Sequence, residues 1–212
     1  MRVLPRVLVL ISGCVATVAT TAASAQEVKF QGNTTGCFYS TLTTPCTSLS
    51  SSTSWNSLTF NSGAFNSYTS GARLSFPGGS NSLGTFTLGN TPQLYYNLSF
   101  VLNIAFQLPT LVADPNTIYT AALYGYVGTR DGGVHIDFDN TPQSFLFNGP
   151  ENQGEFILRV NDTFVLLDEG SAEIPGDLLV TVVTPEPATM ALLATGLVGL
   201  VPAVRRRRRK SQ

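Results

Sequence analysis

The sequence is poor in charged residues. Asp, Glu, Lys and Arg make up 12% of the 212 residues, and eight of the twelve basic residues lie in the first six or the last eight positions. Between residues 26 and 184, four basic side chains stand against twelve acidic ones, a net charge of −8. A domain with this charge is repelled by nucleic acid and by anionic lipid. We therefore expect no nucleic-acid partner.

The sequence also lacks the short motifs that mark common active sites. It contains no Gly-x-Ser-x-Gly elbow, no His-Glu-x-x-His pair and no phosphate-binding glycine loop. One histidine, His135, leaves few nitrogen ligands for a zinc ion. These absences predict a protein that is not an enzyme and that uses no cofactor.

A helical pattern of three turns is missing before residue 188, whereas apolar residues alternate with polar ones from Trp55 onward. The alternation is clearest between Leu94 and Leu108, where every even position is apolar. Such a run predicts a long strand with one buried face, which bends or bulges to stay on the core.

Two other segments depart from simple alternation. In residues 119–127 both the odd-numbered and the even-numbered positions are largely apolar, which predicts a central strand covered on both sides. Residues 31–56 are rich in Ser, Thr and Asn and predict a loop or an irregular edge. The predicted fold class is all-β, an antiparallel, jelly-roll-like β-sandwich of eight to ten strands formed by one domain over residues 26–183.

The start of the chain has the features of a secretory signal peptide. A basic start and an apolar stretch precede the small residues that end at Ala25, so cleavage is expected between Ala25 and Gln26. Residues 1–25 would then be removed on export. The alternative is a lipoprotein box at residues 11–14, in which Cys14 would carry lipid, although this leaves a very short apolar region.

Cys37 and Cys46 are the two cysteines left after this cleavage. Because the exported chain matures in an oxidising compartment, we expect a disulfide between them. Closing this short loop would stabilise the fold by about 2.5–3 kcal/mol. The alternative, a metal site, lacks partners because the one histidine lies far away in the sequence.

The last thirty residues contain three parts in a fixed order. Pro185-Glu186-Pro187 comes first, an uncharged apolar segment follows at 188–204, and six consecutive basic residues occupy 205–210. A helix of this apolar length is about 25 Å long, the lower limit for crossing a bilayer. Because basic residues stay in the cytoplasm, 188–204 is predicted to be a transmembrane helix in the inner membrane, with the middle domain outside. The alternative is a plain anchor preceded by an accidental Pro-Glu-Pro.

This order resembles the PEP-CTERM sorting signal of exported bacterial proteins. The resemblance rests on Pro185, Glu186 and Pro187, followed by the apolar segment and the basic stop. It implies that residues 184–210 are a sorting segment read by an exosortase, a membrane-embedded processing enzyme, in Gram-negative bacteria that make extracellular polysaccharide. The protein would be anchored in the inner membrane before processing and would lie afterwards on the cell surface or in the extracellular matrix, near exopolysaccharide. In organisation, the middle domain is similar to the small all-β choice-of-anchor ectodomains that carry such tails.

One polar cluster in the middle domain could carry chemistry. If residues 134–138 form a strand, His135, Asp137 and Asp139 project together from its outer face, about 6.6 Å apart at each step. This spacing is too wide for all three to bind one metal without a bulge. Asp137 and Asp139 could in principle act as the carboxylate pair of a glycoside hydrolase, but exposed acids on a strand face usually only increase solubility. We interpret the cluster as a solvated strand face after a hairpin turn and predict no metal site.

Exposed aromatic residues suggest a second function class. If Tyr39, Trp55, Tyr68 and Tyr95 are exposed, their rings could stack on sugars. The alternative is that some of them belong to the core or cover an edge of a sheet. The first class is a non-enzymatic structural protein of the cell surface or extracellular matrix. The second is a carbohydrate-binding or weakly carbohydrate-active module displayed by the same route.

Overall fold

A computed structural model describes residues 27–40, 46, 48–149 and 153–183, and every regular element within these ranges is a β-strand. All pairings between these strands are antiparallel. The prediction of an all-β chain is therefore confirmed, although fourteen strands replace the eight to ten expected. Within these ranges, no helix is long and apolar enough to cross a membrane.

The largest sheet has six strands, in the order β12-β9-β8-β7-β1-β4. In this order they are β12 (Thr163–Leu166), β9 (Gly132–Phe138), β8 (Asn116–Val127), β7 (Gln93–Leu108), β1 (Lys29–Ser40) and β4 (Ala64–Tyr68). The longest strand, β7, has 16 residues and pairs with both β1 and β8. Three long strands thus form the centre of this sheet.

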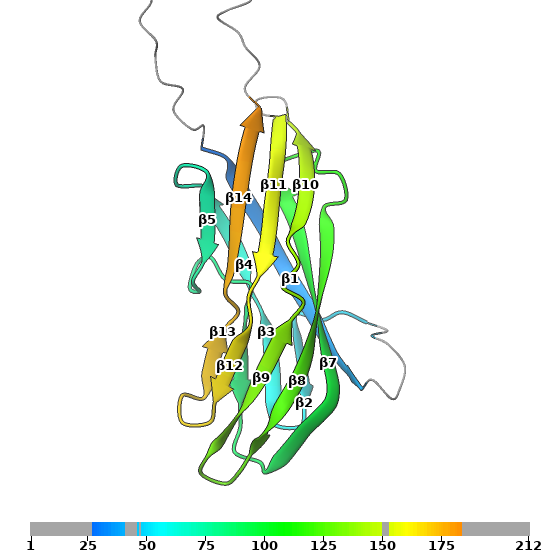
Figure 1. The fold of residues 1–212 in the computed structure, drawn as a ribbon, viewed down its shortest axis with the longest axis vertical. Helices are drawn as coiled ribbons and strands as arrows, with labels where there is room; N and C mark the ends of the chain where they lie inside the picture. The colour runs from blue at the N-terminus through cyan, green and yellow to red at the C-terminus, as the bar shows by residue number, and fades with distance from the viewer. Residues whose placement is uncertain (1–26, 41–45, 47, 150–152, 184–212) are drawn as a thin grey trace, which may run out of the picture.

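Two four-stranded sheets complete the fold. One contains β10 (Gln143–Asn148), β11 (Gln153–Val160), β14 (Gly176–Val183) and β5 (Arg73–Phe76), in this order. The other contains β13 (Ser171–Glu173), β6 (Gly84–Leu88), β3 (Leu58–Ser62) and β2 (Ser52–Trp55). The first lies in the upper half of the molecule and the second in the lower half (Figure 1).

Both smaller sheets pack against one face of β7. The ring centre of Phe100 lies 4.8 Å from that of Phe60 in β3 and 5.0 Å from that of Phe86 in β6. Phe106, on the same face of β7, lies 4.9 Å from Phe156 in β11. Aromatic pairs at these distances add to the free energy gained from burial. The long strand therefore joins the lower and upper sheets into one core.

A bulge changes the phase of the alternation in β7. The pairing with β8 shifts between Tyr95 and Leu98, and Asn97 between them adopts a left-handed φ of 52°. After the bulge the even-numbered residues turn inward, as predicted. Before it, Tyr95 is buried, while Leu94 and Tyr96 are exposed. The expected bulge is confirmed, and the expected inward orientation of Leu94 and Tyr96 is wrong.

The prediction of a loop over 31–56 is wrong for its first part, which belongs to β1. Several inward positions of this strand carry glycine, so no apolar alternation marks it. A Cβ added to Gly32 would lie 2.4 Å from Cζ of Phe65, and one added to Gly36 would lie 2.4 Å from Cζ of Phe100. Rings from the neighbouring strands β4 and β7 therefore fill the space that side chains of β1 would occupy.

The prediction that residues 119–127 are covered on both faces is also wrong. In β8 the buried and exposed positions alternate, and Ile118, Tyr124 and Tyr126 are about half exposed on the outer face. The odd-numbered apolar residues of β8 therefore fill the core, whereas the even-numbered ones form an exposed surface.

Tyr119 of β8 connects the two layers by a hydrogen bond. Its buried hydroxyl donates to the carbonyl oxygen of Leu158 in β11 at 2.7 Å. Burial raises the pKa of this hydroxyl well above its ordinary value of 10.0. Above pH 10 the unfolded chain therefore loses this proton before the folded chain does, and the free energy of unfolding falls as the pH rises.

We predict that Tyr119→Phe lowers the free energy of unfolding at pH 7 by about 1 kcal/mol, because one buried hydrogen bond is lost. The same variant should show a shallower loss of stability above pH 10, since one raised phenol pKa is gone. Urea unfolding between pH 7 and 11 measures both effects. Tyr68→Phe, at an exposed tyrosine, is the matched control and should change neither. An unchanged alkaline slope in Tyr119→Phe would contradict the prediction.

Candidate functional site

The polar cluster predicted from the sequence lies on the outer face of the six-stranded sheet. His135 and Asp137 are exposed on β9, and the apolar residues that alternate with them are buried, as predicted. The imidazole of His135 stacks on the ring of Tyr124 in β8, with 5.0 Å between centroids, and on that of Phe164 in β12, with 4.2 Å. The histidine is therefore the middle member of an aromatic ladder across three strands.

Asp139 is not part of this strand face. It follows the end of β9, and its carboxylate accepts hydrogen bonds from the hydroxyl and the backbone N–H of Thr141. These hydrogen bonds lower the pKa of the Asp139 carboxyl below its ordinary value. The three predicted residues thus make different local contacts. Among the residues that the structure describes, no three His, Cys, Asp or Glu side chains are grouped closely enough to hold a metal ion.

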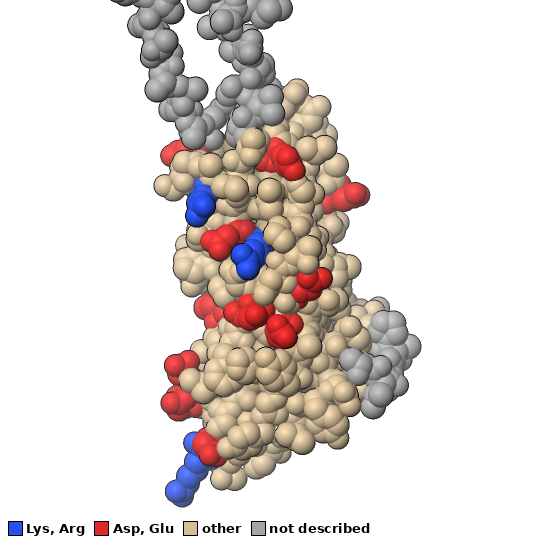
Figure 2. Space-filling model, in the orientation of Figure 1, with Lys and Arg blue, Asp and Glu red and all other residues tan. Residues whose placement is uncertain are grey.

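The ladder belongs to a larger exposed surface, which we call the outer aromatic face and define by Tyr124, Tyr126, His135 and Phe164. All four side chains are exposed. Figure 2 shows this region, over β12, β9 and β8, as a largely uncharged area below the acidic side chains that cross the middle of the molecule. Acidic groups lie only beside it, since the hydroxyl of Tyr126 donates to the carboxylate of Asp131 at 3.0 Å. An aromatic surface of this kind suits a ligand that presents apolar faces rather than negative charge.

A pocket of about 250 Å³ adjoins this face at the start of β7. Trp55 and Tyr96 line it, together with Asn56 and Gln93, whose side chains carry amide groups. Leu94 also lines the pocket and pairs across the strands with Tyr126 of the outer aromatic face. The pocket therefore combines exposed rings with amide groups that can both donate and accept hydrogen bonds.

The four aromatic residues expected at the surface have different positions. Trp55 and Tyr68 are exposed, and Tyr39 is half-buried. The prediction for Tyr95 is wrong, because the bulge turns this residue inward until it is only 3% exposed, with its hydroxyl 2.9 Å from Oγ of Ser57. Burial raises the pKa of Tyr95 above its ordinary value.

Sequence reasoning missed the pocket because it placed Leu94 and Tyr96 in the core. The signal that could have located it is Asn97, a residue type that tolerates the left-handed conformation and stands inside an otherwise regular alternation. Asn56, in the turn between β2 and β3, adopts the same conformation, with φ 53°. Each side of the pocket thus contains an asparagine in the left-handed conformation, one in a hairpin turn and one at the bulge in β7.

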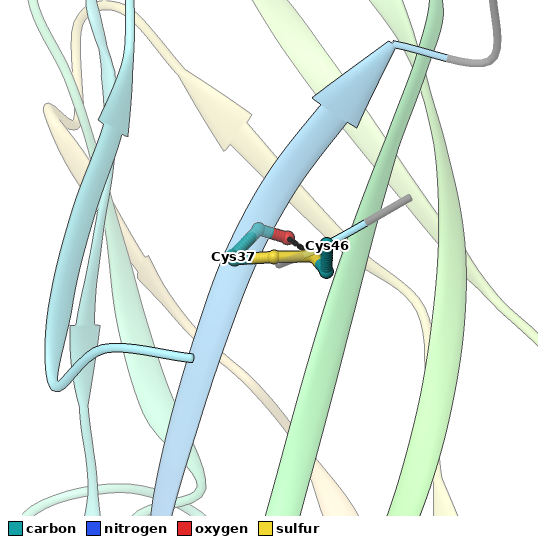
Figure 3. Close-up of a disulfide and its surroundings, with 2 residues drawn as sticks. All are labelled: Cys37 and Cys46. Atoms are coloured by element: carbon teal, nitrogen blue, oxygen red, sulfur yellow. Dashed lines mark hydrogen bonds between the residues drawn. A yellow bond between two sulfur atoms is a disulfide. The ribbon is translucent and has the colours of Figure 1, made fainter. Parts of the chain in front are cut away.

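The cysteines expected to pair are joined in the structure. A disulfide connects Cys37 of β1 to Cys46, with 6.1 Å between the two Cα atoms (Figure 3). Cys37 is nearly buried, and Ser40, three residues further along β1, lines the pocket. The disulfide therefore restrains the chain close in sequence to this site.

The sorting segment follows the last strand of the fold. β14 ends at Val183, and the first and last described residues lie at the same end of the molecule (Figure 1). The predicted cleavage between Ala25 and Gln26, the motif Pro185-Glu186-Pro187, the transmembrane helix at 188–204 and the basic stop at 205–210 lie outside the described residues.

Comparison with known families identifies the tail. Residues 183–209 match the family described as the PEP-CTERM protein-sorting motif. The chain thus carries the signal of an exported protein that is sorted through an exosortase by way of a membrane-anchored segment. No curated protein and no solved structure is significantly similar to the chain. The likeness of the middle domain to choice-of-anchor ectodomains stays a prediction.

We predict that the triple variant His135→Ala, Asp137→Asn, Asp139→Asn folds and is exported. Removing the imidazole from the ladder should lower the free energy of unfolding by about 0.2–1 kcal/mol, the range for a cross-strand pair. Urea unfolding and the exported yield measure this, and Asp137→Asn alone is the control without loss of a ring. A metal-dependent rise in the melting temperature of the parent that the triple variant lacks would show that these residues hold a metal.

Proposed function

We propose that the protein is a non-enzymatic, structural component of the cell surface or extracellular matrix of a Gram-negative bacterium. Its signal peptide directs export, residues 188–204 hold the precursor in the inner membrane, and an exosortase processes it beside Pro185-Glu186-Pro187. The match of residues 183–209 to the sorting motif supports the export and processing part of this proposal. The folded product is an antiparallel β-sandwich that acts through its surface.

The contacts of the polar cluster support a non-enzymatic role. Paired acid and base catalysis needs two groups that face the same substrate atom. His135 stacks between two aromatic rings on the strand face, whereas Oδ1 of Asp139 accepts two hydrogen bonds from Thr141 beyond the end of β9. Packing and turn formation therefore account for the positions of these two residues without a catalytic role.

The second candidate function, carbohydrate binding, is supported by the outer aromatic face and the adjoining pocket. The C–H faces of a sugar can pack on aromatic rings, and its hydroxyl groups can pair with amide side chains such as those of Asn56 and Gln93. Because the domain has a net charge of −8 over residues 26–184, it favours a neutral polysaccharide over an anionic one. An exopolysaccharide of this kind is the proposed ligand.

We predict that Glu186→Ala leaves the precursor in the inner membrane at full-length mass, whereas the wild type is released as a shorter product. The substitution removes the one charge of the motif and keeps the apolar segment and the basic stop, so insertion should be unaffected. Fractionation and intact-mass analysis of tagged proteins in a host with an exosortase measure release. Equal retention of wild type and Glu186→Ala at full-length mass would show an ordinary membrane anchor.

For the pocket, we predict that Trp55→Ala and Tyr96→Ala each weaken binding of a neutral glycan by about three- to tenfold, the loss expected for one aromatic contact. Glycan-array screening of the released protein, with and without Ca²⁺, identifies the ligand, and titration then gives the affinities. Tyr68→Ala is the matched control, because Tyr68 is exposed but lies on β4, outside the pocket. Equal losses in all three variants, or no glycan bound by the wild type, would exclude this site.

A further inference from the structure

An apolar groove of about 440 Å³ lies in the upper half of the molecule, beside the strand from which the sorting segment leaves. The loop between β7 and β8 forms one side, and β10 and β11 form the other. Leu111 of the loop is 72% exposed and Leu146 of β10 is 65% exposed. Removing apolar side chains from water is favourable, so these two leucines would contribute to binding if a partner covered them.

The groove is held open by backbone contacts. The N–H of Ala113 donates to the carbonyl oxygen of Leu146 at 3.0 Å, and that of Asn148 donates to the carbonyl oxygen of Leu111 at 3.3 Å. Leu111 adopts a left-handed φ of 58°, a conformation that leucine rarely takes without support from its surroundings. The two leucines are therefore presented in a fixed arrangement before any partner binds.

The position of the groove connects it to the sorting motif. Thr181 of β14 lies in its wall, and so does Gln153, the residue of β11 that pairs with Val183. The motif begins at Pro185, two residues beyond Val183, so an extended chain places it within about 7 Å of the end of the strand. Any enzyme that encloses the motif must therefore contact this end of the folded domain.

We propose that the groove is a docking site for the processing enzyme itself, and that it receives an apolar segment which the enzyme extends from the membrane surface. This inference rests on the proposed processing at Pro185-Glu186-Pro187. A groove fits a protruding protein segment, whereas contact with an anionic bilayer surface is helped by basic residues. The groove has Glu155 in its wall and the domain is acidic, so the enzyme is favoured over lipid.

Docking of this kind makes processing depend on the fold. The groove exists only when the β7–β8 loop and strands β10, β11 and β14 are assembled, because all of them contribute to it. A second contact also raises the effective concentration of the motif at the active site of the enzyme. The enzyme would thus release folded domains faster than unfolded ones that carry the same tail.

The test uses the full chain in a host with an exosortase and follows release by pulse-chase. The double variant Leu111→Ser, Leu146→Ser should be released about tenfold more slowly than wild type, which corresponds to a loss of about 1.4 kcal/mol. The control is Leu49→Ser, Ile118→Ser, which alters two exposed aliphatic side chains outside the groove and should be released at the wild-type rate. Melting temperatures show that each variant is folded. Release of the groove variant at the wild-type rate would overturn the proposal.

Photocrosslinking identifies the occupant. A photoreactive residue at position 146 of the Glu186→Ala precursor, which is expected to stay uncleaved, should give an adduct with the exosortase, and one at position 49 should give none. Adducts with lipid alone would assign the groove to the bilayer and overturn the enzyme proposal. If wild type is cleaved and Glu186→Ala is not, while the groove variant is normal, only the docking inference fails. If wild type is not cleaved at all, the proposed processing fails with it.

Discussion

The fold depends on one face of β7 being buried along its length against two separate sheets. Phe100 contacts the lower sheet and Phe106 contacts the upper one. The two small sheets are therefore connected through β7. Because side chains alternate along a strand, this use of one face leaves the other face of the large sheet outside the core. The outer aromatic face is the part of that surface formed by β8, β9 and β12. The core and the candidate ligand surface are thus opposite sides of the same strands.

The sequence predicted those parts of the fold in which apolar and polar residues alternate without interruption. The second half of β7 and the orientation of β9 follow from alternation alone. It could not predict β1, because Gly32 and Gly36 stand where rings from Phe65 and Phe100 supply the apolar surface. It also failed before the bulge, since one additional residue reverses which side chains face the core. In each case the missing information lies in another strand.

The two candidate functional regions differ in the same way. The sorting motif is linear, so its three parts could be identified before any fold was considered, and the match at residues 183–209 supports them. The pocket is assembled from residues near 55 and near 95, at the turn between β2 and β3 and at the bulge in β7. A site of this kind requires the pairing register, which the composition of either segment does not contain. The polar cluster shows the opposite relation between sequence and structure. His135 and Asp139 are close in sequence, but one stacks on aromatic rings and the other binds Thr141.

The place of β14 within its sheet has a mechanical consequence. It is an inner strand, paired with β11 over eight residues and with β5 over four. Because antiparallel hydrogen bonds run perpendicular to the strands, a pull along the C-terminal tail loads both ladders in shear, and many bonds must break together. A tail joined to an edge strand and pulled across the sheet would open one bond at a time. A domain pulled by this tail, as the uncleaved precursor would be, can therefore bear tension without losing its fold strand by strand.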